Sequence, residues 1–416
     1  MSKKTILVIG TFDTKSVELE YLAGRIRQQG GEVLTMDVSV LGEPQRPTDL
    51  SKHDVAAAGG MSIDEVIALG DEHRAFQVMT RGAVDLVASG HREGKFDGMI
   101  ALGGTMGTDL ALDCAKALPM GVPKYIVSTV ACSPLIEPNR LAADVQMILW
   151  AGGLFGMNQI CKSSLSQAAG AVLGAARAVE PPTWDRSLIG MTSLGSSCLK
   201  YMKRLQPALV ERGFDVAVFH TTGMGGMAFE ALAAEGAFCC VMDFSLQEFV
   251  NDQHGSLVSS GDHRVTSAGR MGIPQLVAPG AMDLIDLAGW QDIPESLADR
   301  PFHQHNRLIK SSVFAAEERR ALARSLAERL EQAQGPTHFF LPAGGLEEWD
   351  REGQEAHDPE GLKAFVDEIR RILPGKVEMT DLDCHINDEE FVQAVLSKFD
   401  QWVDEGIVKR RQKAPQ

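Results

Sequence analysis

The stretch Gly98-Met-Ile-Ala-Leu-Gly-Gly-Thr-Met-Gly-Thr-Asp-Leu-Ala-Leu112 passes from an apolar run through a glycine-rich turn into an amphipathic pattern. This order is typical of one βα unit, and we expect a strand over residues 98–102. Glycines let the backbone approach a ligand closely, and free amides at the start of a helix suit an anion. We interpret the turn as an anion-binding loop, and the alternative is a tight turn with no ligand.

The turn does not match the fingerprint of dinucleotide-binding proteins. Leu102 stands where that fingerprint has a glycine, and no acidic residue ends the next expected strand, which closes at Ser128. Thr108 or Asp109 is placed to cap the helix that follows the turn. The pattern therefore predicts a small phosphate-bearing ligand but not the dinucleotide signature.

Short β-branched runs alternate with longer helical patterns along the rest of the chain. We expect strands at residues 5–9, 32–38, 98–102, 124–130, 188–191, 215–219, 239–243, 275–278 and 377–380. Such alternation predicts βαβ units and mostly parallel sheets. Because 416 residues exceed what one hydrophobic core usually serves, we predict an α/β fold of two Rossmann-like subdomains.

The expected domain boundary is Glu180-Pro-Pro-Thr-Trp-Asp185, where two prolines follow a long Ala/Gly-rich helix and precede a new strand. The domains then cover residues 1–180 and 185–416. A C-terminal helix at about residues 388–402 belongs to the second domain by sequence, although packing on the first stays open. We expect the glycine-rich βα loops of both domains to face one interdomain cleft.

The two halves carry similar motifs in the same order. Residues 6–11 resemble residues 187–192, and the glycine turn at 103–107 has a counterpart at 223–226. An internal repeat predicts the same strand order in both halves, with the two glycine turns at equivalent strand ends. The alternative is that any two Rossmann-like halves look this similar.

Gly10-Thr-Phe-Asp-Thr-Lys-Ser16 forms the first βα turn and places Lys15 at the start of a helix. A cation there costs a few tenths of a kcal/mol, because the amino end of a helix is already positive, and a bound anion would reverse this cost. The turn is not a Walker A loop, since the spacing is one residue short and Thr14 replaces the glycine before the lysine. In the alternative, Asp13 or Thr14 caps the helix and Lys15 points to solvent.

Composition excludes several kinds of partner. The net charge of −16 and the absence of a basic cluster with interleaved aromatic residues argue against nucleic acid. No apolar stretch reaches about 18 residues, so we expect no membrane span, and we interpret residues 5–9 as a strand rather than a signal peptide. Seven cysteines without a CxxC pair indicate thiols in a reducing compartment, which predicts a cytoplasmic protein.

Acidic and histidine residues near the C-terminus are candidates for chemistry. If the chain stays extended after the strand at 377–380, then Asp381, Asp383 and His385 share one face. With His303 or His305 they would form an acid/base set or the ligands of a divalent cation. We name Asp383, His385 and His305 as candidate catalytic residues and leave any metal ligands unassigned. The alternative is that the group caps the next helix.

Seven short motifs connect the chain to a known family: Gly10-Thr-Phe-Asp-Thr-Lys15, Leu102-Gly-Gly-Thr-Met-Gly-Thr108, Ser128-Thr-Val130, His220-Thr-Thr-Gly-Met-Gly-Gly226, Pro279-Gly-Ala-Met-Asp283, His305-Asn306 and Asp383-Cys-His-Ile-Asn-Asp388. The chain resembles the ATP-binding domain family named for the tomato mosaic virus resistance protein, in order and over nearly all of its length. The resemblance implies two Rossmann-like subdomains, ATP bound through the first, and a homodimer.

By position, the resemblance places ATP, which we expect with Mg²⁺, against Gly10, Thr11, Asp13, Lys15, Gly103, Gly104, Thr105, Gly107, Thr108, Ser128 and Thr129. The leading hypothesis is an ATP-binding protein, as a nucleotide-dependent enzyme acting on a small carbonyl or acid substrate in the interdomain cleft. One alternative is a non-catalytic binding or regulatory protein that depends on ATP. The other is a metal-assisted lyase or hydrolase.

Overall fold

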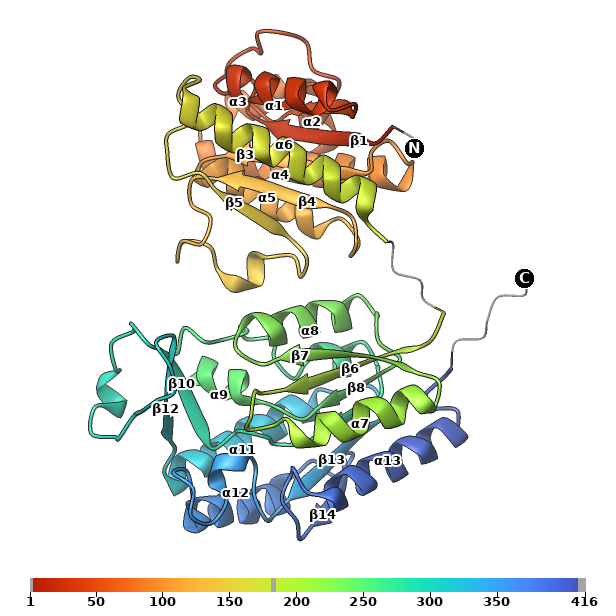
Figure 1. The fold of residues 1–416 in the computed structure, drawn as a ribbon, viewed down its shortest axis with the longest axis vertical. Helices are drawn as coiled ribbons and strands as arrows, with labels where there is room; N and C mark the ends of the chain where they lie inside the picture. Colours follow the sequence, from red (N-terminus) through yellow and green to blue (C-terminus); the bar gives the residue numbers. More distant parts are fainter. Residues whose placement is uncertain (1–2, 181–184, 411–416) are drawn as a thin grey trace. The chain divides into compact units, whose positions relative to one another are not determined.

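The computed structural model describes residues 3–180 and 185–410, and the chain divides into two compact units, Met1–Thr183 and Trp184–Gln416 (Figure 1). Most of the expected boundary segment, residues 181–184, lies outside the described residues. Each unit has its own parallel sheet and its own buried clusters of apolar side chains. The predicted class, two Rossmann-like α/β subdomains, is confirmed.

The first unit alternates strands and helices. Its strands are β1 (Thr5–Gly10), β2 (Glu32–Asp37), β3 (Gly98–Gly103), β4 (Lys124–Ser128) and β5 (Gln146–Leu149). Its helices are α1 (Ser16–Gln28), α2 (Lys52–Ala58), α3 (Ile63–Ala68), α4 (Glu72–Arg92), α5 (Thr105–Lys116) and α6 (Gln159–Ala178), with a short 3₁₀ turn at Pro138–Arg140.

Helices cover both faces of the first sheet, whose strand order is β2-β1-β3-β4-β5 with every pair parallel. Alternate residues of β1 point to opposite faces, as the pleat requires. Ile6 and Val8 pack with α1 and α6, whereas Leu7 and Ile9 pack with α2 to α5. This two-sided burial explains why β1 is apolar throughout rather than alternating with polar residues.

The second unit adds a small antiparallel sheet to the same plan. Its strands are β6 (Leu188–Ser193), β7 (Asp215–His220), β8 (Cys240–Asp243), β9 (Gln275–Val277), β10 (Leu284–Ala288), β11 (His303–Gln304), β12 (Ile309–Val313), β13 (Thr337–Pro342) and β14 (Glu378–Leu382). Its helices are α7 (Lys200–Glu211), α8 (Met224–Ala234), α9 (Gln247–Gln253), α10 (Ser267–Arg270), α11 (Ala316–Glu331), α12 (Pro359–Ile372) and α13 (Glu389–Asp404), with 3₁₀ turns at Glu295–Leu297 and Glu348–Asp350.

The parallel sheet of the second unit has the order β14-β13-β9-β8-β6-β7, and β10, β12 and β11 form the separate antiparallel sheet. The C-terminal helix α13 belongs to this unit. Its apolar face, which includes Phe391, Val395 and Phe399, packs in one cluster with Met242 and Phe340 of the sheet. The small antiparallel sheet is thus an addition to the doubly wound core that surrounds the parallel sheet.

The repeat prediction is half right. When the strands of each parallel sheet are numbered in chain order, both sheets have the order 2-1-3-4-5, and the sheet of the second unit adds a sixth strand. The glycine turns, however, are not equivalent, because residues 103–107 follow the third strand of the first unit and residues 223–226 follow the second strand of the second unit. The strand order is shared, but the predicted correspondence of the two turns is wrong.

Several strands differ from the expectation. The strand expected at 124–130 ends at Ser128, where the Ser128 hydroxyl accepts a hydrogen bond from the Val130 amide and turns the chain. Strands β5, β10, β11, β12 and β13 were not expected. β10 and β12 pair across the segment 289–308, and a non-local pairing of this kind leaves no local signal in the sequence.

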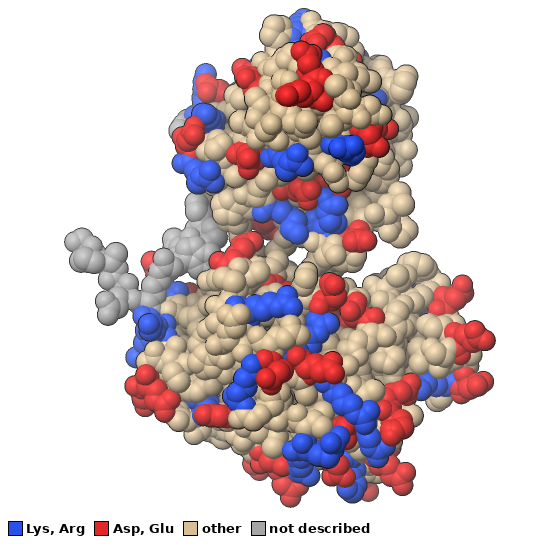
Figure 2. All heavy atoms as spheres, turned by 180° about the vertical axis from the view of Figure 1, so that it is seen from behind, with Lys and Arg blue, Asp and Glu red and all other residues tan. Residues whose placement is uncertain are grey.

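Charged side chains of both signs are mixed on the molecular surface. Figure 2 shows Lys and Arg interspersed with Asp and Glu on the drawn face of each unit, without an extended basic surface. Among the described residues, no helix combines the length and the apolar character that crossing a membrane requires.

Candidate functional site: a cavity in the first unit

A cavity of about 770 Å³ opens at the carboxyl ends of β1, β2 and β3 and is lined only by residues of the first unit. In the order β2-β1-β3-β4-β5, the chain reverses its direction of winding between β1 and β3. Open α/β sheets bind ligands outside the carboxyl ends of the strands at this reversal point. The fold therefore leaves a large cavity at the place where such a sheet holds a small molecule.

One wall of the cavity is polar and consists of the two turns that the sequence singled out. Thr11, Asp13 and Lys15 come from the β1–α1 turn, and residues 103–107 come from the β3–α5 turn. Seven of the eleven residues expected at the nucleotide line the cavity: Thr11, Asp13, Lys15, Gly103, Gly104, Thr105 and Gly107. The structure thus brings two turns that are far apart in the sequence to one surface.

The two helices that begin at this wall have no side-chain cap. Lys15 is the N-cap of α1 and Gly104 is the N-cap of α5, and neither side chain accepts a hydrogen bond from the helix. The other four helices of the unit are capped by Ser51, Ser62, Asp71 and Asn158. The first amides of α1 and α5 therefore lack the side-chain acceptor that the other helices have, which suits an anionic ligand.

The predicted caps of these two helices are wrong. Helix α5 begins at Thr105, so Thr108 already lies in its first turn and hydrogen bonds to the buried Ser128 hydroxyl at 2.7 Å. Asp109 forms an ion pair with Arg140 at 2.7 Å. At α1 neither Asp13 nor Thr14 is the cap. Helix α5 starts directly after the glycines of the β3–α5 turn, and therefore before the two side chains that were predicted to cap it.

Lys15 and Asp13 are the charged groups of the polar wall. The Lys15 ammonium lies 4.9 Å from the centre of the Phe155 ring and has no carboxylate partner among the described residues. Asp13 Oδ2 accepts a hydrogen bond from the Gly42 amide at 3.3 Å. Asp13 Oδ1 is buried and, within the described part of the chain, has no partner. Both groups are therefore available to a ligand.

The opposite wall is mostly apolar, although Asp71 and Glu72 at the start of α4 also line the cavity. It is formed by the loop after β2, with Val38, Val40 and Leu41, and by α3 and α4, with side chains that include Ile67 and Phe76. Leu41 is 76% exposed. This wall was not predicted, although the apolar residues directly after β2 were a readable signal.

Asp37, at the end of β2, connects the two walls of the cavity through hydrogen bonds. Its buried carboxylate accepts hydrogen bonds from the Phe12 amide at 3.1 Å and from the Ser39 amide at 3.0 Å. Phe12 belongs to the polar turn and Ser39 to the loop of the apolar wall. One carboxylate therefore fixes the spacing between the two walls.

Four residues expected at the nucleotide do not line the cavity: Gly10, Thr108, Ser128 and Thr129. A Cβ atom at Gly10 would lie 2.7 Å from Leu19 Cδ1, so this glycine serves the packing of α1 on β1. Thr129 donates its amide to the Gly103 carbonyl at 3.3 Å and supports the glycine turn from behind. These residues shape the turns without facing the cavity.

The structure does not assemble the expected C-terminal catalytic set. His385 is buried, and its Nε2 lies 2.6 Å from the Glu347 carbonyl and 2.9 Å from Asp350 Oδ1. Asp383 is exposed, and His305 packs on the Trp349 ring with centroids 5.4 Å apart. In the described ranges, 3–180 and 185–410, no three His, Cys, Asp or Glu side chains could hold a metal ion.

The reason for this failure is local. β14 ends at Leu382 and the chain bends at Asp383, so the alternation that would have put Asp381, Asp383 and His385 on one face stops there. Asp381 pairs with Arg370 at 2.6 Å, and His303 pairs with Glu355 at 2.6 Å. In the described residues these side chains have other partners and no group that could hold a metal ion forms, whereas an acid/base role of Asp383, His385 and His305 stays a prediction.

His385 instead borders a buried acidic cluster that the sequence did not suggest. Burial, together with the nearby Asp283, raises the pKa of Glu347 to about 9. Burial also raises the pKa of Asp283 to about 7, although Arg319 opposes this shift. Within the described residues, neither Asp283 oxygen nor Glu347 Oε1 has a hydrogen-bond partner. These carboxyl groups hold protons that ordinary carboxyl groups would release.

The molecule is thus a two-unit, doubly wound α/β protein with a cavity at the winding reversal of its first unit. Its sequence matches the N-terminal domain of the uncharacterised protein family UPF0261 over residues 4–181 and the C-terminal domain over residues 186–403. The chain belongs to this family, and the predicted family relationship is confirmed.

Relatives match along almost the whole chain. A UPF0261 protein of Brucella melitensis is 54% identical over 403 residues, which cover 97% of this chain and 96% of the relative. A UPF0261 protein of Clostridium tetani is 33% identical and covers 96% of this chain and 98% of its own. The tomato (Solanum lycopersicum) ToMV resistance protein Tm-1 is 27% identical over 95% of this chain and 55% of its own length.

Solved structures are only distantly similar. A putative UDP-N-acetylglucosamine 2-epimerase from Listeria monocytogenes is 13% identical and covers 67% of this chain and 79% of its own, with a TM-score of 0.22.

Proposed function

We propose that the first unit binds ATP in its cavity, with the phosphates at the polar wall and the base at the apolar wall. The observation that carries this proposal is the pairing of two uncapped helix starts with an apolar wall across one cavity. A volume of about 770 Å³ is also within the usual range of about 300 to 1,000 Å³ for small-molecule sites.

Helix starts alone are too weak to hold ATP. Each contributes roughly 0.3 to 1 kcal/mol to a bound anion, whereas micromolar affinity requires about 8 kcal/mol. Backbone hydrogen bonds from the glycine turn, the Lys15 charge and contact of the base with Phe76 and its neighbours supply the rest. Micromolar affinity for ATP therefore needs contacts with both walls of the cavity.

The charges in the cavity favour a nucleotide that carries Mg²⁺. Asp13, Asp71 and Glu72 line the cavity together with the single cation Lys15, so free ATP would meet a net negative surface. Mg²⁺ in nucleotide sites is held by one or two protein oxygens together with phosphate oxygens. Asp13, with its unpartnered Oδ1, is the residue that would hold the ion, and the ion would offset phosphate charge.

Two roles are compatible with this site. In the first, the protein is a nucleotide-dependent enzyme that acts on a small carbonyl or acid substrate, and the expected cleft between the domains stays a prediction. In the second, ATP only sets the shape of a binding surface. ATP turnover by purified protein, stimulated by a cell extract, would separate the enzyme from the binding protein.

A cytoplasmic location belongs to the same proposal. All seven cysteines are free, and four of them, Cys114, Cys161, Cys198 and Cys240, are buried. Free thiols are the rule in reducing compartments.

Calorimetry on the full chain tests the binding proposal. We expect heat of binding when ATP and Mg²⁺ are titrated into the folded protein, and weaker binding when EDTA removes the metal. The absence of binding at millimolar ATP with Mg²⁺ would overturn the assignment.

A further inference from the structure

The second unit has its own cavity, of about 130 Å³, at the carboxyl ends of β6, β7 and β8. We propose that it is a separate site for a small uncharged molecule with several hydroxyl groups, such as a sugar or polyol. The winding of this unit reverses between β6 and β8, so the cavity has the same place in its sheet as the nucleotide cavity has in the first unit. The small antiparallel sheet, through Asp286 and Ser311, closes one side.

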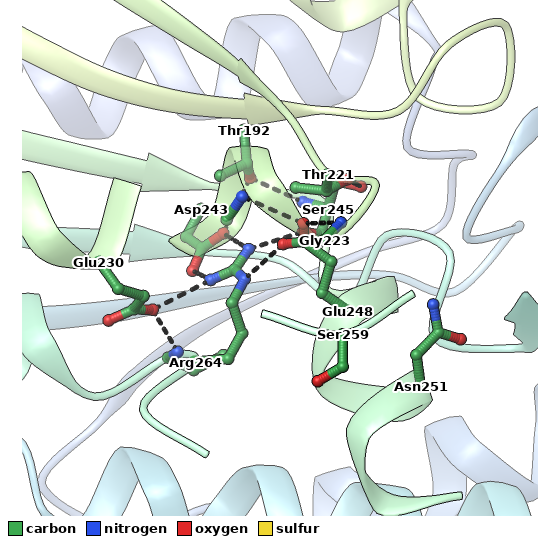
Figure 3. Close-up of polar contacts among 12 residues, drawn as sticks. Thr192, Thr221, Gly223, Glu230, Asp243, Ser245, Glu248, Asn251, Ser259 and Arg264 are labelled. Carbon is green, nitrogen blue, oxygen red and sulfur yellow. Dashed lines mark hydrogen bonds and ion pairs between the residues drawn. The ribbon is translucent and has the colours of Figure 1, made fainter. Parts of the chain in front are cut away.

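The glycine turn beside this cavity already has a carboxylate on its amides. Glu248 Oε1 accepts a hydrogen bond from the Gly223 amide at 2.5 Å (Figure 3). It accepts a second from the Gly226 amide at 3.0 Å. A Cβ atom at Gly226 would lie 1.6 Å from Glu248 Oε2, so only glycine lets the carboxylate approach. Glu248 occupies the position that a phosphate would take at an open turn of this kind.

A buried arginine holds Glu248 in place. Arg264 is fully buried and lies between Asp243, Glu230 and Glu248, as Figure 3 shows. Its Nη2 is 2.6 Å from Asp243 Oδ1, and its Nε is 3.2 Å from Glu248 Oε2. The network fixes the loops after β7 and β8, which contribute Thr222 and Gln247 to the cavity. The cavity walls are therefore organised before any ligand binds.

The lining carries no Lys or Arg side chain, and it contains the carboxyl group of Asp286. An anion would therefore meet no fixed positive charge and one acidic group. This lining contrasts with the first unit, where Lys15 stands beside open helix starts. The charge pattern excludes a second phosphate site and favours a neutral ligand.

The polar groups of the cavity match hydroxyl groups, which both donate and accept. Gln247 is 1% exposed, and its Oε1 has no partner in the part of the chain that the structure describes. His220 Nδ1 accepts a hydrogen bond from the Gly195 amide at 3.3 Å, so in the neutral ring Nε2 carries a hydrogen and donates. Trp349 adds an apolar ring surface against which the C–H groups of a sugar can pack.

Ligand-detected NMR on the full chain tests this proposal. The probes are D-ribose and glycerol, with L-lactate and methyl phosphate as anionic counterparts that carry observable C–H groups. We expect saturation transfer to at least one of the uncharged probes and none to the anions. Equal or stronger transfer to the anions, or transfer to none of the four, would overturn the proposal.

Variants locate the site. We expect Trp349→Ala and Gln247→Met each to weaken binding of the uncharged probe at least tenfold. Trp290→Ala, which removes a tryptophan that is 72% exposed and outside the cavity lining, should change nothing. Lys15→Ala should also leave probe binding unchanged, so this test is independent of ATP in the first unit. Unchanged probe binding in both cavity variants, with folding verified by circular dichroism, would contradict the site.

Discussion

Lys15 offers a direct test at the scale of one residue, because it is the only cation among the residues that line the first cavity. We predict that Lys15→Ala weakens ATP binding by about 1.5 to 3 kcal/mol, the usual value for a hydrogen bond to a charged group. Calorimetry measures the change. Lys95→Ala removes the same charge at an ion pair with Glu93, away from the cavity, and should have no effect. Unchanged affinity in Lys15→Ala would relocate the site.

Gly104 tests whether the backbone must approach the ligand. A Cβ atom there would meet no protein atom closer than Thr129 Oγ1, at 3.8 Å, so a side chain should be tolerated by the fold. We predict that Gly104→Val keeps the melting temperature within a few degrees but abolishes ATP binding, because the side chain would occupy the place of the phosphates. Retained ATP binding in this variant would show that the ligand does not rest on the turn.

The raised pKa of Glu347 in the buried acidic cluster can be tested through the pH dependence of the free energy of unfolding. Its pKa is about 9 in the folded protein against 4.5 for an ordinary glutamate, so between these values the folded state holds a proton that the unfolded state releases. The free energy of unfolding therefore falls as pH rises through this window. Asp283 and Asp350 lie near Glu347 and raise its pKa further, the hydrogen bond from the Trp349 amide lowers it, and Arg319 lowers the pKa of Asp283.

We predict that Glu347→Gln is more stable than the wild type at pH 8, on the order of 1 to 3 kcal/mol, and that the difference vanishes near pH 4. The amide resembles the protonated carboxyl group and cannot ionise. Urea unfolding at several pH values measures the effect. The exposed Glu352→Gln is the matched control. Greater stability of the wild type at pH 8 would mean that Glu347 is ionised in the fold.

At the scale of elements, glycines decide how closely helices approach. A Cβ atom at Gly82 of α4 would lie 1.8 Å from the Val55 carbonyl of α2, whereas one at Gly24 of α1 would meet nothing within 4 Å. We predict that Gly82→Ala destabilises the first unit by about 1 to 3 kcal/mol through overpacking. Gly24→Ala should stabilise it by up to about 1 kcal/mol through helix propensity. Thermal unfolding compares them, and equal melting temperatures would refute the packing argument.

The two glycine turns show how one type of element serves two purposes. The turn at residues 103–107 begins an uncapped helix beside an open cavity. The turn at residues 223–226 donates its amides to Glu248. Glycine content alone therefore does not separate a ligand site from a structural carboxylate site, because the same amides serve either anion.

At the scale of the whole molecule, we predict a homodimer on the strength of the family resemblance. The Ala/Gly-rich helix α6 does not add support, because Ala168, Ala169 and Ala176 are buried within the first unit. Light scattering at micromolar concentration should give about twice the chain mass of 45.0 kDa. A particle of 45.0 kDa would end this prediction.

The βα units, the fold class and the two turns of the polar wall could be predicted from local patterns in the chain. Strand patterns such as residues 5–9, and glycine or lysine at a turn, are local properties, so they can be read without knowing their neighbours in space. The turns at 10–15 and 103–108 were each interpreted as anion-binding for this reason, the family resemblance placed one nucleotide against both, and residues of both turns line the cavity.

Three further features of the protein depend on tertiary packing and could not be predicted from local patterns. The apolar wall exists because β2 lies beside β1 and brings Val40 and Leu41 opposite the glycine turn. The second glycine turn donates its amides to a side chain because Glu248 packs against it. The pKa values of Asp283 and Glu347 are raised because both residues are buried. Each of these properties arises between segments that are distant in sequence. The physical reason is that burial and non-local pairing, unlike turn chemistry, are set by the packing of the whole unit.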